Sequence, residues 1–136
     1  MSNATKLVDM PVSSELVRLL MDVGYVATGR GLQTRAEAVF AGAIAARPNS
    51  EFPLIGLGVC KINFGDFVAA AKILSEKALK INPSSGLAKC FLAIAVKSLG
   101  RKDYAYELAS QVITSCEETA AVTLAKSIVA GRDVAQ

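Results

Sequence analysis

Three cysteines, Cys60, Cys90 and Cys116, are the side chains of this 136-residue chain best suited to chemistry. A thiolate acts as a nucleophile, as a metal ligand or as half of a redox pair. These three are odd in number and far apart, without the close Cys-x-x-Cys pairs of metal knuckles and redox motifs. The chain also lacks histidine, the usual base for a cysteine nucleophile and the commonest metal ligand. We therefore expect buried cysteines, no metal or other cofactor, and no enzymatic activity.

The overall composition excludes several further classes of protein. The net charge is +3, from 15 Lys and Arg against 12 Asp and Glu, which is too small for the strongly basic surface that binds nucleic acid. Hydrophobic residues make up 52% of the chain, too many for a disordered protein. Charge-free runs such as 52–60 are far shorter than the roughly 20 residues that cross a bilayer, so we expect no contact with a membrane. The polar start, residues 1–11, does not resemble a secretory signal, which favours the cytoplasm.

A repeat of 34 and then 35 residues organises the chain, whose length suits one domain. Small and apolar residues fall into register when the sequence is shifted by these lengths, and each unit has a glycine near its middle. No stretch alternates apolar and polar residues with a period of two. Each unit therefore predicts two amphipathic helices around a Gly-centred turn, in an all-α domain. The residues in register are Val23, Leu57 and Leu92; Gly24, Gly58 and Ala93; Gly31, Gly65 and Gly100; and Ala36, Ala70 and Ala105.

Capping signals mark where these helices begin and end. Ser, Thr or Asp is expected at an N-cap, often with Glu three residues later, and Pro is typical of a helix end. The motifs Arg-Pro-Asn-Ser (47–50) and Asn-Pro-Ser-Ser (82–85) predict helix ends followed by new N-caps. A last helix, ending at Gly131, is expected to cover the final repeat. The N-caps predicted for the second helices and the last helix are Thr34, Asp66, Asp103 and Ser115.

Small residues recur where the two helices of a unit must approach closely. A large side chain there would push the helices apart, so we expect Gly58→Leu to unfold the domain. Bulkier residues such as Phe40 and Leu74 are expected to fill the space between units. Val23 and its equivalents in the later units are expected on the core side of the first helices.

These residues resemble the tetratricopeptide repeat. Unit one matches its pattern without a gap, unit two has one extra residue in its second helix, and unit three lacks the closing proline. The resemblance implies three stacked helical hairpins and a capping helix in a right-handed α-solenoid. The predicted division is a flexible N-terminus at 1–12, repeats at 17–50, 51–85 and 86–116, a capping helix at 117–131 and a tail at 132–136, with the domain spanning 13–131.

The resemblance also implies a concave groove lined by the first helix of each repeat. The inward positions are mostly apolar here, and the first helices of units two and three are apolar nearly all round, which indicates burial on every face. The groove would bind an amphipathic helix with anchors spaced i, i+3, i+4 and i+7. A register shifted by one residue would instead place some of these residues in the core. The predicted partner-binding residues are Met21, Tyr25, Phe52, Ile55, Val59, Ile62, Leu87, Cys90, Phe91 and Ile94.

Two consequences of this groove concern its partners. Ile55→Asp or Val59→Asp is expected to leave the fold intact and remove partner binding, because the charge loses water only when the partner docks. Tetratricopeptide domains that clamp the C-terminal carboxylate of heat-shock proteins place polar residues on this face, where Met21, Tyr25 and Gly56 stand here. We therefore expect no carboxylate clamp.

Two stretches resemble the chaperones of type III secretion systems, which are bacterial and associated with virulence. Residues 52–60, followed by Gly65-Asp66-Phe67, resemble the second repeat of the translocator chaperones. Residues 20–29, with Ala36-Glu-Ala38, are similar to the first repeat of the needle-subunit chaperones. Either branch implies a cytoplasmic chaperone that sequesters an amphipathic helix of a secreted needle or translocator subunit. The needle branch also implies a second small helical co-chaperone.

A structural scaffold or adaptor is the alternative function. Its groove would be filled by another copy of the same chain, which gives a homodimer when no client is present.

Overall fold

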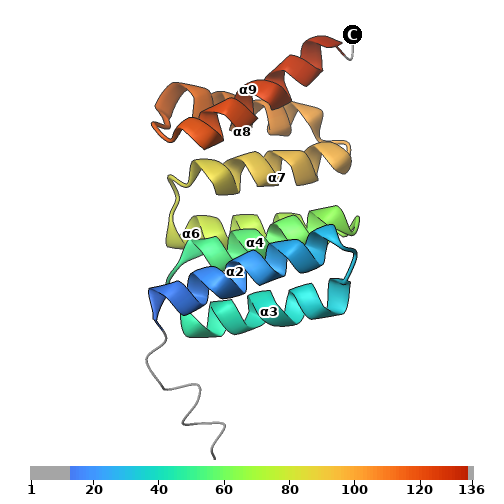
Figure 1. The fold of residues 1–136 in the computed structure, drawn as a ribbon. Helices are drawn as coiled ribbons and strands as arrows, with labels where there is room; N and C mark the ends of the chain where they lie inside the picture. The colour runs from blue at the N-terminus through green and yellow to red at the C-terminus, as the bar shows by residue number, and fades with distance from the viewer. Residues whose placement is uncertain (1–12, 135–136) are drawn as a thin grey trace, which may run out of the picture.

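The computed structural model describes residues 13–134, with side chains up to Gly131, so the flexible N-terminus predicted for 1–12 lies outside the described range. Helices and short connections make up that range, which confirms the all-α prediction. Figure 1 shows the helices stacked in layers, from α2 and α3 at one end to α8 and α9 at the other. The elements are α2 (Ser14–Gly29), α3 (Gln33–Ala46), α4 (Glu51–Asn63), α5 (Phe67–Ile73), the π-helical η1 (Leu74–Ala78), α6 (Leu79–Ile81), α7 (Gly86–Ser98), α8 (Lys102–Ser115) and α9 (Thr119–Val134).

The turn inside each hairpin is built on a glycine with positive φ, as the repeat predicts. Gly31, Gly65 and Gly100 have φ values of 77°, 80° and 89°, a conformation that side-chain-bearing residues rarely adopt. In every turn the next residue donates its N–H to a carbonyl in the preceding helix, for example Asp66 to Lys61 at 2.8 Å. The three hairpins therefore share one turn geometry.

The N-caps match the prediction only in part. Asp66 accepts a hydrogen bond from the Ala69 N–H, and the serines at the ends of 47–50 and 82–85 cap α4 and α7. Thr34 and Asp103 were expected to cap but lie inside α3 and α8. The N-cap is the residue directly after the turn glycine. In those two hairpins it is Leu32 and Arg101, and neither side chain makes a capping hydrogen bond. The predicted caps of these helices were therefore wrong.

The extra residue of unit two is absorbed by a π-helical segment. Helices α5 and α6 form one continuous helix with η1 (Leu74–Ala78) between them. A single inserted residue inside a helix widens one turn in this way, because the backbone then bonds to the fifth residue instead of the fourth. Leu74 and Ala78, at the two ends of the wide turn, stay fully buried, so the core-facing side keeps its register.

The glycines and alanines of the repeat sit where helices touch. A Cβ on Gly58 would lie 2.9 Å from Leu74, which is buried between the hairpins as expected. Phe40 is fully buried in the same way between α2, α3 and α4, with Ala27, Ala36 and Cys60. The remaining core runs from α4 through α7 and α8 to α9.

Helix α9 covers the last hairpin, as the capping helix was expected to do. It packs on α7 and α8 and buries Ala121, Ala125 and Ile128. It begins at Thr119 and runs through Gly131 to Val134, so Gly131 is not a C-cap and residues 132–134 belong to the helix. The predicted cap at Ser115 was also wrong, because that residue ends α8 and its hydroxyl donates to the Gln111 carbonyl of the same helix.

Candidate functional site

The first helices of the three hairpins, α2, α4 and α7, present equivalent positions to one side of the stack. Sequence offsets of 34 and 35 residues relate the helices, so a residue in one helix has counterparts in the other two. Tyr25, Val59 and Ile94 are one such set, and Arg18, Phe52 and Leu87 are another. The members of the two sets are seven residues apart in each helix, which is about two turns, so they lie on one face.

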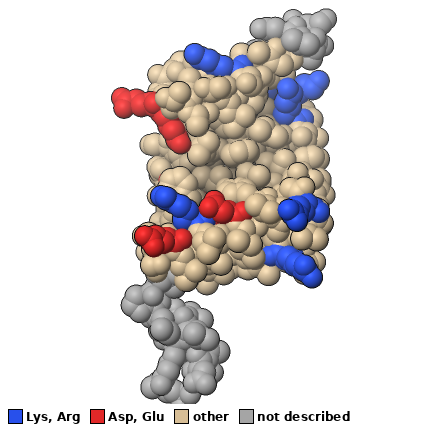
Figure 2. Space-filling model, in the orientation of Figure 1, with Lys and Arg blue, Asp and Glu red and all other residues tan. Residues whose placement is uncertain are grey.

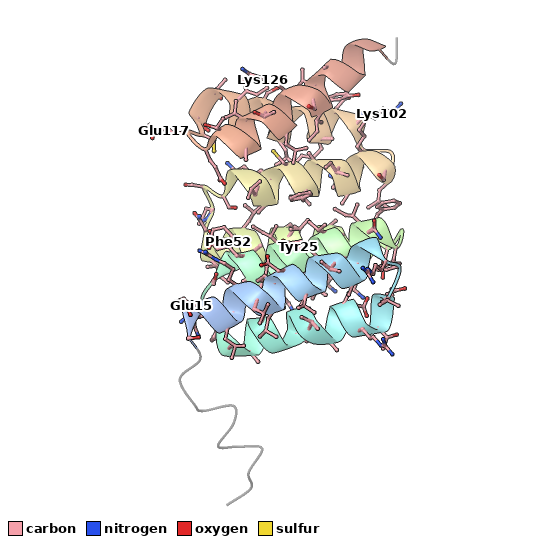
Figure 3. All side chains as sticks on the ribbon, viewed as in Figure 1. Glu15, Tyr25, Phe52, Lys102, Glu117 and Lys126 are labelled. Carbon is pink, nitrogen blue, oxygen red and sulfur yellow. The ribbon has the colours of Figure 1, made fainter. Side chains whose placement is uncertain are left out.

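This face carries most of the predicted groove residues as partly exposed apolar side chains. Phe52 is 53% exposed and Tyr25 is 40% exposed. Both lie between α2 and α7 in the view of Figure 3. We call the following set the groove face: Met21, Tyr25, Phe52, Val59, Ile62, Leu87, Phe91 and Ile94, of which all except Tyr25 and Phe52 are half-buried.

Two predicted groove residues belong to the interior instead. Ile55 is 3% exposed and Cys90 is 0% exposed, and both join the main core. The Cys90 thiol donates to the Ala121 carbonyl of α9 at 3.3 Å, and burial raises its pKa to about 11. The equivalent residue of α2, Met21, approaches Gly56 of α4. In α4 and α7 this position therefore lies in the core, and we leave Ile55 and Cys90 out of the partner surface. Met21 remains half-buried and stays in the groove face.

The N-terminal part of the groove face is held from beneath by Phe40. The ring of Tyr25 packs edge-on against the Phe40 ring, with centroids 5.2 Å apart and an interplanar angle of 70°. A Cβ on Gly24 or on Gly56 would lie 2.7 Å and 2.4 Å from that ring. Desolvation by burial raises the Tyr25 pKa above its ordinary value, so its hydroxyl stays neutral at physiological pH. The position of Tyr25 thus depends on how tightly three helices close around one ring.

A hollow of about 420 Å³ lies beside Phe52, between the start of α2 and the start of α4. Its lining is mixed and includes both the aliphatic Val17 and the basic Arg18. A hollow of this kind accepts an apolar anchor residue with an acidic or polar neighbour. The lining residues are Ser14, Val17, Arg18, Met21, Arg47, Ser50, Phe52 and Pro53.

Charged groups lie mainly around this surface. Figure 2 shows a broad uncharged area over α7, with charged side chains along α2 and at the left and right edges of the same face. Two of the basic groups rest on aromatic rings, Lys97 over Tyr106 at 5.5 Å and Arg101 over Tyr104 at 4.9 Å. An uncharged centre bordered by charge is the usual anatomy of a protein interface.

Among the described residues, the cysteines do not form a metal site. Cys60 and Cys90 are buried, as predicted, whereas Cys116 is partly exposed. Within that part of the chain, no group of three or more Cys, Asp or Glu residues is placed to hold a metal ion. Among the described helices, none combines the length and the apolar character needed to span a bilayer.

A second apolar surface was not expected from the sequence, because Val23, one of its residues, was predicted to lie on the core side of its helix. Val23 is 46% exposed, although its counterparts Leu57 and Leu92 are half-buried and fully buried. Leu57 packs against the cluster around Phe40 of the preceding hairpin, and Leu92 belongs to the main core. No described hairpin precedes α2. The signal in the sequence was an apolar stripe along the first helix of the first repeat.

Comparison with known proteins identifies the fold. No model of a known protein family matches the chain, and no curated protein matches it significantly. Among solved structures, the translocator chaperone SycD of Yersinia enterocolitica type III secretion superposes with a TM-score of 0.76 at 15% identity, covering 90% of this chain and 91% of SycD. PcrH, in complex with the chaperone-binding region of PopB, superposes with a TM-score of 0.73 at 18% identity, covering 88% of this chain and 96% of PcrH.

A further similar structure is the first tetratricopeptide domain of Spaghetti (RPAP3), bound to the HSP90 peptide SRMEEVD. It superposes with a TM-score of 0.69 at 16% identity and covers 93% of this chain and 99% of that domain. Identities this low establish the fold alone. The chain therefore has the tetratricopeptide-repeat fold, as the repeat pattern predicted, and resembles both peptide-binding domains and type III secretion chaperones.

Proposed function

We propose that this chain is a cytoplasmic type III secretion chaperone, which holds an amphipathic helix of a secreted needle or translocator subunit against the groove face. The observation that carries the proposal is the continuous row of half-exposed apolar side chains across α2, α4 and α7. The solved complexes of PcrH with a region of PopB and of SycD with a peptide of YopD support it, because both chaperones share this fold.

Apolar burial on the groove face is the driving force of the proposed binding. If each of its eight side chains loses a further ~30–60 Å² of apolar surface, the gross gain at about 25 cal/mol/Å² is roughly 6–12 kcal/mol. The loss of translational and rotational freedom, and the ordering of side chains at the interface, offset several kcal/mol of this gain. Because the margin is small, one well-exposed anchor such as Phe52 contributes a large share of the net affinity.

The ligand is an apolar helix rather than a charged chain terminus. The positions where a carboxylate clamp needs polar side chains carry Met21, which is half-buried, Tyr25, which packs on Phe40, and Gly56, which has no side chain. We expect the HSP90 peptide SRMEEVD, which the RPAP3 domain binds, to show no saturable binding to this chain by fluorescence anisotropy.

Co-expression with needle and translocator subunits of type III secretion systems tests the proposal. We expect a soluble complex on size-exclusion chromatography, and we expect Phe52→Asp to remove it. Phe52 is the second residue of α4, next to the Ser50 cap, and is more than half exposed, so the acidic replacement leaves the fold stable. A milder change, Phe52→Ala, removes about 60 Å² of the apolar surface buried on binding, which is about 1.5 kcal/mol, and weakens binding about tenfold.

Val68→Asp is the matched control for the groove variant. Val68 is 66% exposed on α5, the second helix of its hairpin, and is not part of the groove face. This variant should bind the subunit as the unaltered chain does. A complex that survives Phe52→Asp, or one that is lost with Val68→Asp, would contradict the proposed site.

A further inference from the structure

The hollow beside Phe52 is the place where the groove face meets concentrated charge. Two arginines line it, Arg18 on α2 and Arg47 at the end of α3, and none of the described residues in its lining is acidic. Arg18 is exposed, whereas Arg47 is half-buried and its guanidinium donates to the carbonyl of Ala46 at 3.0 Å. We call this hollow, which combines an aromatic side chain with two guanidinium groups, the basic hollow.

The acidic residues closest in sequence do not pair with Arg18. Glu15 and Asp22 lie on α2, three residues before it and four residues after it, but neither lines the basic hollow. Within the described part of the chain, no ion pair joins either carboxylate to Arg18. Glu51, at the start of α4, instead accepts a hydrogen bond from the Asn82 side chain at 3.1 Å. Arg18 is therefore available to a carboxylate of a bound partner.

Two helices begin at the basic hollow and add to its positive potential. Ser14, the first residue of α2, and Ser50, the N-cap of α4, both belong to its lining. The first turn of a helix has N–H groups without a partner in the helix and carries the positive end of the helix dipole. Both helix starts therefore favour an anionic group over a cationic one, as the two arginines do.

This charge is confined to the first hairpin. The counterparts of Arg18 in α4 and α7 are Phe52 and Leu87, which are both groove-face residues. A bound helix that packs apolar side chains on these two residues places its next turns opposite Arg18. An apolar side chain there would bury the guanidinium without a partner, which is unfavourable, whereas a carboxylate would pair with it.

We propose that the basic hollow selects an acidic side chain that lies one or two turns from an apolar anchor on the bound helix. The anchor packs on Phe52, and the carboxylate pairs with Arg18. This inference rests on the proposed function, because it describes the helix that the groove face holds. It adds a charge requirement that the apolar groove face alone does not impose, and it assigns the acidic end of that helix to the first hairpin.

Two synthetic helical peptides test the charge requirement. Both carry leucines at i, i+3, i+4 and i+7, followed on the same face at i+11 and i+14 by two glutamates in one peptide and two lysines in the other. In fluorescence anisotropy the unaltered chain should bind the glutamate peptide roughly fivefold more tightly than the lysine peptide. Arg18→Glu should reverse this preference, and Arg18→Gln should bring the two affinities close together. Comparing chain variants with the same two peptides cancels any difference in helix content between the peptides.

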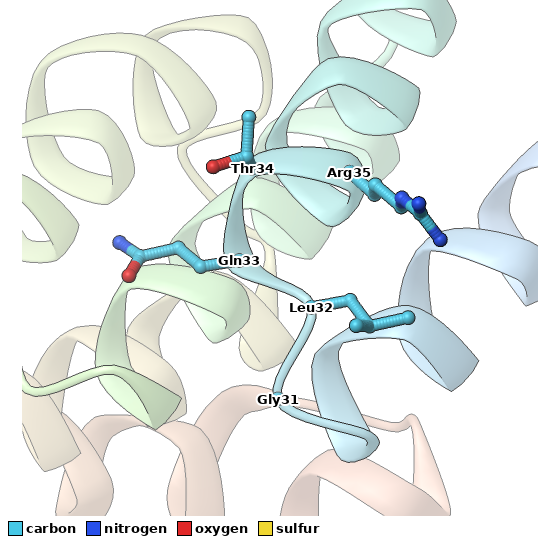
Figure 4. Close-up of a pocket in the computed structure, with 5 residues that line it drawn as sticks. All are labelled: Gly31, Leu32, Gln33, Thr34 and Arg35. Carbon is cyan, nitrogen blue, oxygen red and sulfur yellow. The ribbon is translucent and has the colours of Figure 1, made fainter.

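Arg35→Glu is the matched control, because it changes the net charge by the same amount. Arg35 lies on α3, which is not one of the groove helices, and lines a different hollow at the turn of the first hairpin. Figure 4 shows it on the same side of that turn as Leu32. This variant should keep the preference of the unaltered chain. Circular dichroism should show that Arg18→Glu and Arg35→Glu melt like the unaltered chain, because both arginines are exposed.

The outcomes separate this inference from the proposed function. Equal affinities of the unaltered chain for the two peptides would overturn the inference alone, as would a preference that survives Arg18→Glu. A preference lost equally with Arg35→Glu would show a general effect of net charge and would also overturn it. If neither peptide binds the unaltered chain, the groove face does not hold a helix, and the proposed function is overturned as well.

Discussion

Replacing Gly56 by alanine tests the packing that holds α2, α3 and α4 together beneath the groove face. The new Cβ would lie 2.4 Å from Cε1 and 2.8 Å from Cδ1 of Phe40, about 1 Å closer than ordinary contact. The ring cannot move away toward α2, because the backbone of Gly24 already closes on its other side with no room for a Cβ. Phe40 is fully buried, so either α4 or the ring must shift within a packed core.

The expected magnitude follows from two opposing terms. Overpacking costs about 1–3 kcal/mol, and an approach of 2.4 Å to a fully buried ring lies in the upper part of that range, about 2–3 kcal/mol. Alanine in a helix is about 1 kcal/mol better than glycine. Gly42 is the matched control, because it lies inside α3 and a Cβ there meets nothing within 4 Å. We therefore expect Gly56→Ala to lower the free energy of unfolding by about 1–2 kcal/mol and Gly42→Ala to raise it by about 0.5–1 kcal/mol.

Thermal and urea unfolding of the two variants measures the difference directly. At roughly 4 °C per kcal/mol for a domain of this size, their melting temperatures should differ by about 6–12 °C, with the unaltered chain between them. Gly56→Ala should also weaken binding of the partner helix, because Tyr25 rests on the displaced ring. Equal stabilisation by both alanines would refute the close approach of α4 to Phe40.

Three further predictions concern buried and charged groups. Ile55→Asp should lower the free energy of unfolding by about 3 kcal/mol or more in urea titration, because Ile55 is 3% exposed in the core; a fully stable variant would contradict its buried position. The Lys61 ammonium lies 2.7 Å from the Glu37 carboxylate and lowers the pKa of that carboxyl by hydrogen bonding. The pair therefore stabilises the fold at pH values above 4.5, the ordinary pKa of Glu, and this contribution is lost as the pH falls through the lowered pKa. Glu37→Gln should accordingly cost less than about 1 kcal/mol at pH 7 and still less at pH 3; an equal cost at both values would exclude the charge as the cause. In the native chain at pH 8, iodoacetamide should label Cys116 by mass spectrometry and leave Cys90 intact, because burial raises the Cys90 pKa to about 11; early labelling of Cys90 would show that α9 opens readily.

The sequence predicts the hairpin architecture well because its signals are local. A glycine that must adopt positive φ marks each turn, as at Gly65, and the extra residue of unit two corresponds to a π-helical turn. The helix starts after Gly31 and Gly100 were misplaced, because the cap position holds Leu32 or Arg101 and the nearby Thr34 and Asp103 are stronger capping residues. Backbone geometry sets these boundaries, and side-chain preference only accompanies it.

The groove could be predicted in outline but not residue by residue. A helix that is apolar nearly all round gives no sign of which apolar side chain faces a neighbour and which faces the groove. Ile55 and Phe52 are both apolar and one turn apart, yet one packs against the next hairpin and the other is half exposed. Val23 differs from Leu92 only because its hairpin is the first of the described stack.

Photo-crosslinking of the complex tests the central claim most directly. A benzophenone side chain replaces Val59 in the middle of the groove face, or Val68 on the outer helix α5, in the chain co-expressed with its secreted subunit. We predict that the probe at Val59 couples to the helix of the subunit and that the probe at Val68 does not. Coupling from Val68 with none from Val59 would show that the partner binds elsewhere and would contradict a groove that holds a helix.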